Sequence, residues 1–92
     1  MKQKQIEVIP IAHKKAARRT IKKEWIEETI LSPDQVVSGY GGRTIAQKKY
    51  RVDTKDYLLR VIYEEHEDSY IVITTYLTSQ ISRYWKEEEH EG

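Results

Sequence analysis

The residues of this chain that could do chemistry are cations and aromatics spread along its whole length. Lysine and arginine neutralise phosphates, and aromatic rings stack on unpaired bases, so this mixture suits a surface for single-stranded RNA. Cleavage of RNA without a metal would also need a group that accepts the proton of the 2′-hydroxyl, which histidine, tyrosine or a perturbed lysine can do. The set is His13, Arg18, Lys48, Lys49, Arg51, Arg60, Tyr63, Tyr76, Arg83, Tyr84 and Trp85.

The same residues also allow a plain structural interpretation. Seven tyrosines in a chain without cysteine or phenylalanine can serve core and cross-strand packing. Runs of charge are commonly solvated faces, and a single histidine at a helix start, such as His13, is more often a surface or capping residue than a base. RNA binding and ordinary packing therefore both stay open at this point.

Other kinds of site have less support in the sequence. The histidines at 13, 66 and 90 stand in separate contexts, without the spacing of a metal site, and there is no cysteine. No serine sits in an elbow motif beside a histidine. The carboxylates at 64–65 and 87–89 look solvated, whereas burial is what tunes a carboxyl group. We therefore expect no metal and no cofactor.

Charge is segregated along the chain although the net charge is only +1. Residues 13–23 hold six lysines or arginines and residues 43–51 hold four, with no acid in either range, while the acids gather at 64–68 and 87–91. Segregation of this kind can give a neutral protein a basic face. No apolar run approaches the roughly 18 residues of a membrane span, so we expect a cytoplasmic protein without a membrane partner.

The strongest structural signal is a hairpin formed by residues 58–63 and 70–77, which are dense in β-branched and aromatic residues. Its first strand places Arg60 between Leu58 and Ile62 on one side, so the guanidinium needs a carboxylate, an aromatic face or an anionic ligand. In the second strand, strict alternation puts Ile71, Ile73 and Leu77 on one side, and Tyr70, Val72, Thr74 and Tyr76 on the other.

The remaining elements must pack on this hairpin. Helical patterns cover residues 12–19 and 22–31, a strand can begin at 36–37, and a polar strand follows at 44–52 after a glycine-rich turn. On that strand Ala46, Lys48, Tyr50 and Val52 oppose Ile45, Gln47, Lys49 and Arg51. The expected fold is α+β, with two N-terminal helices on one face of a four-stranded antiparallel meander. We expect a flexible or short edge segment over 1–10, one domain over 11–86 and a disordered acidic tail over 87–92.

Over roughly residues 11–86 the chain resembles a family of small uncharacterised bacterial and cyanobacterial domains, and particular residues carry this resemblance. They are His13 with Arg18 or Arg19, Ile21, Trp25-Ile26, Ser32-Pro33-Asp34, the run 59–63, the run 72–76 and Ser79. Thr20-Ile21-Lys22 stands where members of the family often have Gly-Ile-Ser/Thr, which makes this turn and cap atypical. That family is similar to the RelE/ParE and BrnT-type toxins of toxin–antitoxin systems, compact α+β proteins of which many cleave messenger RNA.

The resemblance implies a toxin-like RNA-binding protein whose catalytic form would be a metal-independent endoribonuclease acting on mRNA. It implies catalytic roles for His13, Arg60 and Arg83 and binding roles for Lys48, Lys49, Tyr76 and Tyr84. The basic and aromatic set above adds Arg51 and Trp85 as binding residues. An antitoxin protein would then be the partner that covers the basic face. The alternative is a non-catalytic module for protein contact or self-association, in which a homodimer uses the polar sheet face and Tyr84-Trp85.

Overall fold

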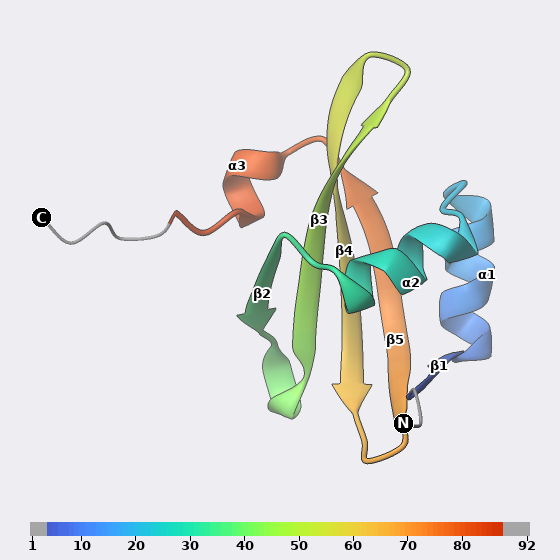
Figure 1. Cartoon of the computed structure of the whole chain (residues 1–92). Coiled ribbons are helices and arrows are strands. Elements are labelled where there is room, and N and C mark those ends of the chain that lie inside the picture. Colours follow the sequence, from blue (N-terminus) through green and yellow to red (C-terminus); the bar gives the residue numbers. More distant parts are fainter. Residues whose placement is uncertain (1–3, 88–92) are drawn as a thin grey trace, which may run out of the picture.

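The computed structural model describes residues 4–87, and its centre is a five-stranded mixed sheet in the order β1-β5-β4-β3-β2 (Figure 1). The strands are β1 Gln5–Val8, β2 Gln35–Ser38, β3 Thr44–Val52, β4 Lys55–Glu65 and β5 Ser69–Thr78. Strands β2 to β5 pair antiparallel in sequence order, whereas β1 pairs parallel with β5. The α+β class is confirmed. The predicted four-stranded antiparallel meander is incomplete, because β1 adds a fifth, parallel strand at the edge.

The edge strand β1 ends at Val8, before Pro10, so the proline does not interrupt it. Ile6 and Val8 pair in register with Tyr70 and Val72. Pro10 is the first residue of helix α1, Pro10–Arg18, a position where the missing N–H costs nothing because no partner exists for it there. The chain between β1 and β5 runs through two helices and the strands β2 to β4, and it returns with β5 parallel to β1.

Helix α1 and helix α2, Lys23–Leu31, cover one face of the sheet. Figure 1 shows α2 crossing the sheet and α1 lying beside β5. A third helix, α3, Ile81–Tyr84, follows β5, and a 3₁₀ turn η1, Tyr40–Gly42, links β2 to β3. The structure therefore has one helix more than the two that were expected, and the sequence pattern did not indicate this third helix. The core between helices and sheet contains Ala12, Ala16, Ile21, Ile26, Ile30, Ala46, Leu59, Val61, Tyr63 and Val72.

The two sides of β3 and β4 follow the predicted alternation, but those of β5 do not. Ile62 pairs with Thr74 whereas Tyr63 pairs with Val72, so one extra residue in β5 forms a bulge. Beyond the bulge the alternation shifts by one, and Val72 lies on the core side together with Leu77. The prediction that Val72 and Leu77 face opposite ways is therefore wrong, while Tyr76 does lie on the face away from α1 and α2, beside Arg60.

The connection between α1 and α2 explains why Thr20 is atypical. The N–H of Ile21 donates to the carbonyl of Ala16 at 2.9 Å and the N–H of Thr20 donates to that of Ala17 at 3.2 Å, which is a Schellman motif. Thr20 takes the left-handed position of that motif with φ 60°, where glycine is favoured. Ile21 is buried against the core, and Lys22 precedes α2 as its N-cap residue without a side-chain cap.

Among residues 4–87 no helix is long and apolar enough to cross a membrane. Most of the acidic tail predicted for residues 87–92 lies outside the described residues, as do the first three residues of the N-terminal segment.

Candidate anion-binding site

Four polar side chains form a row across the face of the sheet that α1 and α2 leave uncovered. Gln35 on β2 pairs with Gln47 on β3, Gln47 pairs with Arg60 on β4, and Arg60 pairs with Tyr76 on β5. Directly opposite residues of neighbouring strands point to the same face, so the pairing alone aligns these four side chains. We call them the polar row.

Hydrogen bonds run along the whole polar row. The Nε of Arg60 donates to Oε1 of Gln47 at 2.6 Å, and its Nη1 donates to the hydroxyl of Tyr76. The Nε2 of Gln47 donates in turn to Oε1 of Gln35 at 2.9 Å. The row ends on the backbone of Lys86, whose N–H donates to Gln35 at 2.9 Å. Gln47 is completely buried, so these bonds satisfy a side chain that water cannot reach.

The C-terminal segment places aromatic rings against the cations of this face. The guanidinium carbon of Arg60 lies 4.4 Å from the ring centroid of Tyr84, and that of Arg83 lies 5.6 Å from the same ring. The ammonium of Lys49 lies 4.0 Å from the ring of Trp85. These distances are typical of cation–π contacts. The cation–aromatic cluster consists of Lys49, Arg60, Tyr76, Arg83, Tyr84 and Trp85.

Carboxylates do not neutralise the cations of this cluster in the part of the chain that the structure describes. The ion pairs there use other cations, such as Arg51 with Asp56 at 3.2 Å and Arg43 with Glu64 at 3.2 Å. None of the pairs within residues 4–87 includes Lys49, Arg60 or Arg83. Arg60 is half-buried and has only neutral hydrogen-bond partners, so no carboxylate within residues 4–87 compensates its positive charge.

A hollow of about 550 Å³ adjoins Arg60 on the uncovered face. Ile45 and Ile62 give it an apolar surface, and Arg43 and Arg60 both reach it. Tyr40 of the 3₁₀ turn also lines it and is 97% exposed. Gly41 and Gly42 follow Tyr40 with φ of 64° and 77°, values that favour glycine, so this turn depends on them.

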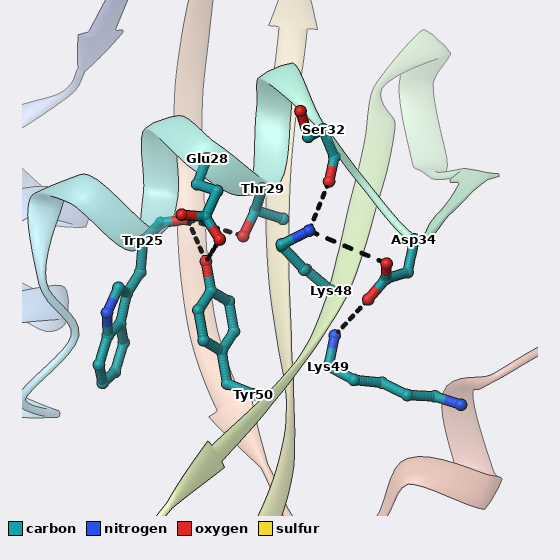
Figure 2. A network of polar contacts seen from close by, with 8 residues as sticks. All are labelled: Trp25, Glu28, Thr29, Ser32, Asp34, Lys48, Lys49 and Tyr50. Atoms are coloured by element: carbon teal, nitrogen blue, oxygen red, sulfur yellow. Dashed lines mark hydrogen bonds and ion pairs between the residues drawn. The ribbon is translucent and has the colours of Figure 1, made fainter.

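Six of the nine residues that were given catalytic or binding roles above make up this cluster, and a seventh, Arg51, lies on the same face but is paired with Asp56. The other two do not join them. Lys48 points to the helix face, where its ammonium donates to the carbonyl of Ser32 at 2.8 Å and lies 3.8 Å from Asp34 (Figure 2). Because Lys48 and Lys49 are adjacent in a strand, only one of them can face the cluster.

His13 is exposed on α1, in the layer that covers the other face of the sheet. It lines a small hollow with Ala17, Ile21 and Lys23 rather than any part of the polar row. The expected catalytic set of His13, Arg60 and Arg83 is thus divided between two faces, with only the two arginines on one of them. The predicted fold had placed the helix of His13 on one face of the sheet, and Arg60 proves to lie on the opposite face, with Arg83 beside it at Tyr84.

Two residues of the site, Gln35 and Gln47, were not among the candidates. The sequence offered one signal, since Gln47 alternates with Lys49 and Arg51 along the polar side of its strand. What it did not offer was the register, which sets Gln47 opposite Arg60 and Gln35 opposite Gln47. A neutral residue with no chemical reactivity of its own becomes part of a site only through such partners.

The other face of β3 carries a polar network that docks α2. The hydroxyl of Tyr50 donates to Oε1 of Glu28 at 3.0 Å, and the rings of Tyr50 and Trp25 stack with centroids 5.2 Å apart (Figure 2). Asp34, just after α2, accepts from the backbone N–H of Lys49 at 2.9 Å. Chiefly burial, supported by the Glu28 carboxylate, raises the pKa of Tyr50 to about 12.

This raised pKa predicts a loss of stability at alkaline pH. The unfolded chain loses the phenol proton near pH 10 and the folded chain only near pH 12, so the stabilising contribution is complete below about pH 10 and disappears between the two values. Because the phenol is partly exposed, we expect a loss of about 1 kcal/mol. Urea unfolding across this range measures it. Tyr50→Phe, which cannot titrate, should lose less stability, and parallel curves for the two proteins would contradict the assignment.

Comparison with known proteins gives a family but no function. No curated protein and no solved structure matches this chain. The sequence pattern of one family, described as a domain of unknown function (DUF4258), matches residues 12–77, which include α1 from its third residue, the whole of α2 and strands β2 to β4, and β5 without Thr78. The expected membership in a family of small uncharacterised domains is confirmed, while the likeness to toxins stays a prediction. The chain belongs to the DUF4258 family.

Proposed function

We propose that the cation–aromatic cluster binds single-stranded RNA, with a phosphate at Arg60 and bases against the neighbouring rings. The observation that carries this proposal is the half-buried guanidinium of Arg60, which has no carboxylate partner within residues 4–87. A cation held by neutral groups keeps its full charge for a ligand, and a phosphate is the anion that arginine binds best through paired N–H donors.

The hydrogen bonds of Arg60 support a phosphate contact in a fixed orientation. Arginine has five N–H donors, and the bonds to Gln47 and Tyr76 use two of them. The others are left for the oxygens of a ligand. Because the polar row and the Tyr84 ring hold the guanidinium plane, little side-chain freedom is lost when a phosphate binds.

The surroundings of Arg60 suit a nucleotide chain better than an isolated anion. Lys49 and Arg83 are exposed beside it and can contact neighbouring phosphates. The hollow lined by Tyr40, Ile45 and Ile62 offers ring and aliphatic surface to a base. Phosphate contacts and stacking are both insensitive to sequence, so the proposed binding is to single strands in general.

Cleavage is a separate question from binding, and the arrangement supplies less for it. His13, the expected base, lies in the helix layer, so we assign it no part in the proposed site. Of the residues in the polar row, Tyr76 is the one whose hydroxyl contacts Arg60. A toxin-like role with an antitoxin partner would follow if a protein rich in carboxylates covered the cluster.

A protein-contact module is the second candidate, and one observation favours it. Val36 on the edge strand β2 is 53% exposed and Tyr40 is 97% exposed, so apolar surface lies near an unpaired strand edge. Tyr84 and Trp85, the residues expected to contact a partner protein, are half-buried against their own chain. We therefore place the partner contact at this strand edge instead. Self-association that Tyr40→Ser abolishes, in a protein that does not bind RNA, would support this candidate.

Binding of a fluorescently labelled single-stranded RNA, measured by anisotropy over a range of salt concentrations, tests the proposal. We expect affinity to fall steeply with salt, as it does when phosphates release counterions. Arg60→Met should weaken binding about 10- to 100-fold, the scale of one arginine contact, and Arg60→Lys should weaken it less. The matched control is Lys14→Ala, which removes an exposed charge from α1 on the other face and should change affinity little.

Thermal unfolding of each variant separates binding from folding. If Arg60→Met is unfolded at the assay temperature, the guanidinium of Arg60 is a structural group. Variants of the exposed residues Lys49 and Arg83 then test the proposal. Alanine at either should weaken binding several-fold in a folded protein. Binding that does not depend on salt, or that Lys14→Ala weakens as much as these variants do, would overturn the proposal.

A further inference from the structure

The basic segment at residues 13–23 lies away from the cation–aromatic cluster, yet its last part borders a second hollow. This hollow, about 540 Å³, lies on the helix face of the sheet near the ends of β3 and β5. Its lining is partly aromatic and aliphatic, from Trp25, Val52, Tyr57 and Leu77. Its volume falls in the range of small-ligand sites.

The rest of the lining is cationic and polar. It comes from Arg19, Thr20 and Lys22 of the connection between α1 and α2, and none of the carboxylates within residues 4–87 lines the hollow. Arg19 is anchored there, because its Nη1 donates to the carbonyl of Thr75 at 2.9 Å. The ammonium of Lys22 lies 5.5 Å from the ring centroid of Trp25, so a positive charge stands next to an aromatic surface.

The local backbone fixes these groups in place. The Schellman motif holds Thr20 at φ 60° and sets Arg19 and Lys22 on either side of it. Trp25 is held as well, since Tyr50 stacks on it and Glu28 binds the Tyr50 hydroxyl (Figure 2). Arg19 of the charged part and Trp25 of the ring part are thus positioned before any ligand arrives.

We propose that this hollow binds a nucleoside phosphate, with the base against Trp25 and Tyr57 and the phosphate at Arg19, Thr20 and Lys22. A ligand that is aromatic at one end and anionic at the other matches the two parts of the lining, and a nucleotide is the common ligand of that kind. The inference is independent of the function proposed for the cation–aromatic cluster, because the two surfaces lie on opposite faces of the sheet.

The two tryptophans allow a direct test, since Trp25 lines this hollow and Trp85 belongs to the cluster. Trp85→Phe leaves Trp25 as the only indole of the chain. Titration of this protein with adenosine 5′-monophosphate should change Trp25 fluorescence with saturation, and adenosine or inorganic phosphate alone should bind at least about tenfold more weakly because each fills only one part of the lining.

Lys22→Ala should weaken the binding of adenosine 5′-monophosphate about five- to tenfold by removing a charge-assisted contact. The matched control is Lys23→Ala, whose exposed ammonium lies 3.9 Å from Glu27 and does not line this hollow, and it should have little effect. Equal losses in the two variants would overturn the proposal, as would phosphate binding as tightly as the nucleotide. No saturable change in Trp25 fluorescence would overturn it too.

A single-stranded oligonucleotide titrated into the same protein distinguishes a free nucleotide from one nucleotide of a strand. Binding of the strand to Trp25 that is tighter than binding of the mononucleotide would assign the hollow to the path of an RNA. Binding of the mononucleotide alone would assign it to a free ligand. Trp25→Phe, in which Trp85 reports on the cluster, shows separately whether the proposed RNA site has failed.

Discussion

Replacing Gln47 with alanine is expected to lower the free energy of unfolding by about 2–4 kcal/mol, a large effect for an uncharged polar residue. Gln47 is completely buried, and its Oε1 is the acceptor for Nε of Arg60 at 2.6 Å. The alanine variant would leave that half-buried donor without an acceptor, would remove the bond to Gln35 and would open a cavity. Urea unfolding monitored by circular dichroism measures the loss.

Gln80→Ala is the matched control, because Gln80 is exposed and its Oε1 accepts only a 3.3 Å bond from Arg83. We expect it to cost less than about 0.5 kcal/mol. Similar losses for the two variants would mean that the polar row contributes nothing beyond an ordinary surface contact.

Gln47→Glu separates the charge of the row from its shape. Glutamate has nearly the same size, and its carboxylate would lie where the Gln47 amide contacts Arg60. If an uncompensated guanidinium is what binds RNA, this variant should lose affinity, because the new carboxylate neutralises Arg60. The carboxylate cannot donate to Gln35 as the Gln47 amide does, so thermal unfolding must first show that the variant is folded. A folded Gln47→Glu protein with unchanged RNA affinity would count against the proposed function.

Much of the fold could be predicted from local patterns. The hairpin of β4 and β5, the two helices and the polar strand β3 each have a period that identifies them, and Pro33 follows soon after the end of α2 at Leu31. Two features depended on distant partners instead. The pairing of β1 with β5 is parallel and joins the first and last strands of the chain, and the bulge in β5 changes which side chains face the core. Neither leaves a signature in the residues concerned.

The candidate site divides in the same way. Arg60 could be predicted because a charge between apolar neighbours on a central strand needs partners, and the structure supplies the Tyr84 and Tyr76 rings among them. That Lys49 and not Lys48 joins it depends on which side of β3 the helices cover. The contribution of Gln47 depends on register. The sequence thus indicated which residues needed partners, and the tertiary structure determined which partners they received.

The side of the sheet that α1 and α2 leave uncovered is not uniformly open, and Leu58 is the residue that tests this. It lies on that side, opposite Lys49 and Thr78, yet it is completely buried. The Trp85 ring lies over Lys49, its register partner, so we infer that the segment after β5 shields Leu58. Leu58→Ala should lower the free energy of unfolding by about 2–5 kcal/mol, the usual effect for a leucine that is fully enclosed.

Ile62→Ala is the matched control on the same strand and face. Ile62 is only half-buried, beside the hollow near Tyr40, and its truncation should cost about 1 kcal/mol. Equal costs for the two variants would show that α3 and Trp85 do not enclose Leu58, and that the cluster forms only when a ligand organises it.

A double-mutant cycle tests whether the segment after β5 encloses Leu58 in the free protein or is ordered only when a ligand binds. If Trp85 shields Leu58, then Trp85→Ala exposes that leucine, and Leu58→Ala should cost less in the Trp85→Ala protein than alone. We expect a coupling of at least about 0.5 kcal/mol, the scale for residues in contact. Coupling of that size means that the same contacts that stabilise the fold also hold Tyr84 against Arg60. The proposed phosphate site would then exist before RNA binds. Additive costs would mean that RNA affinity must include the cost of ordering the segment.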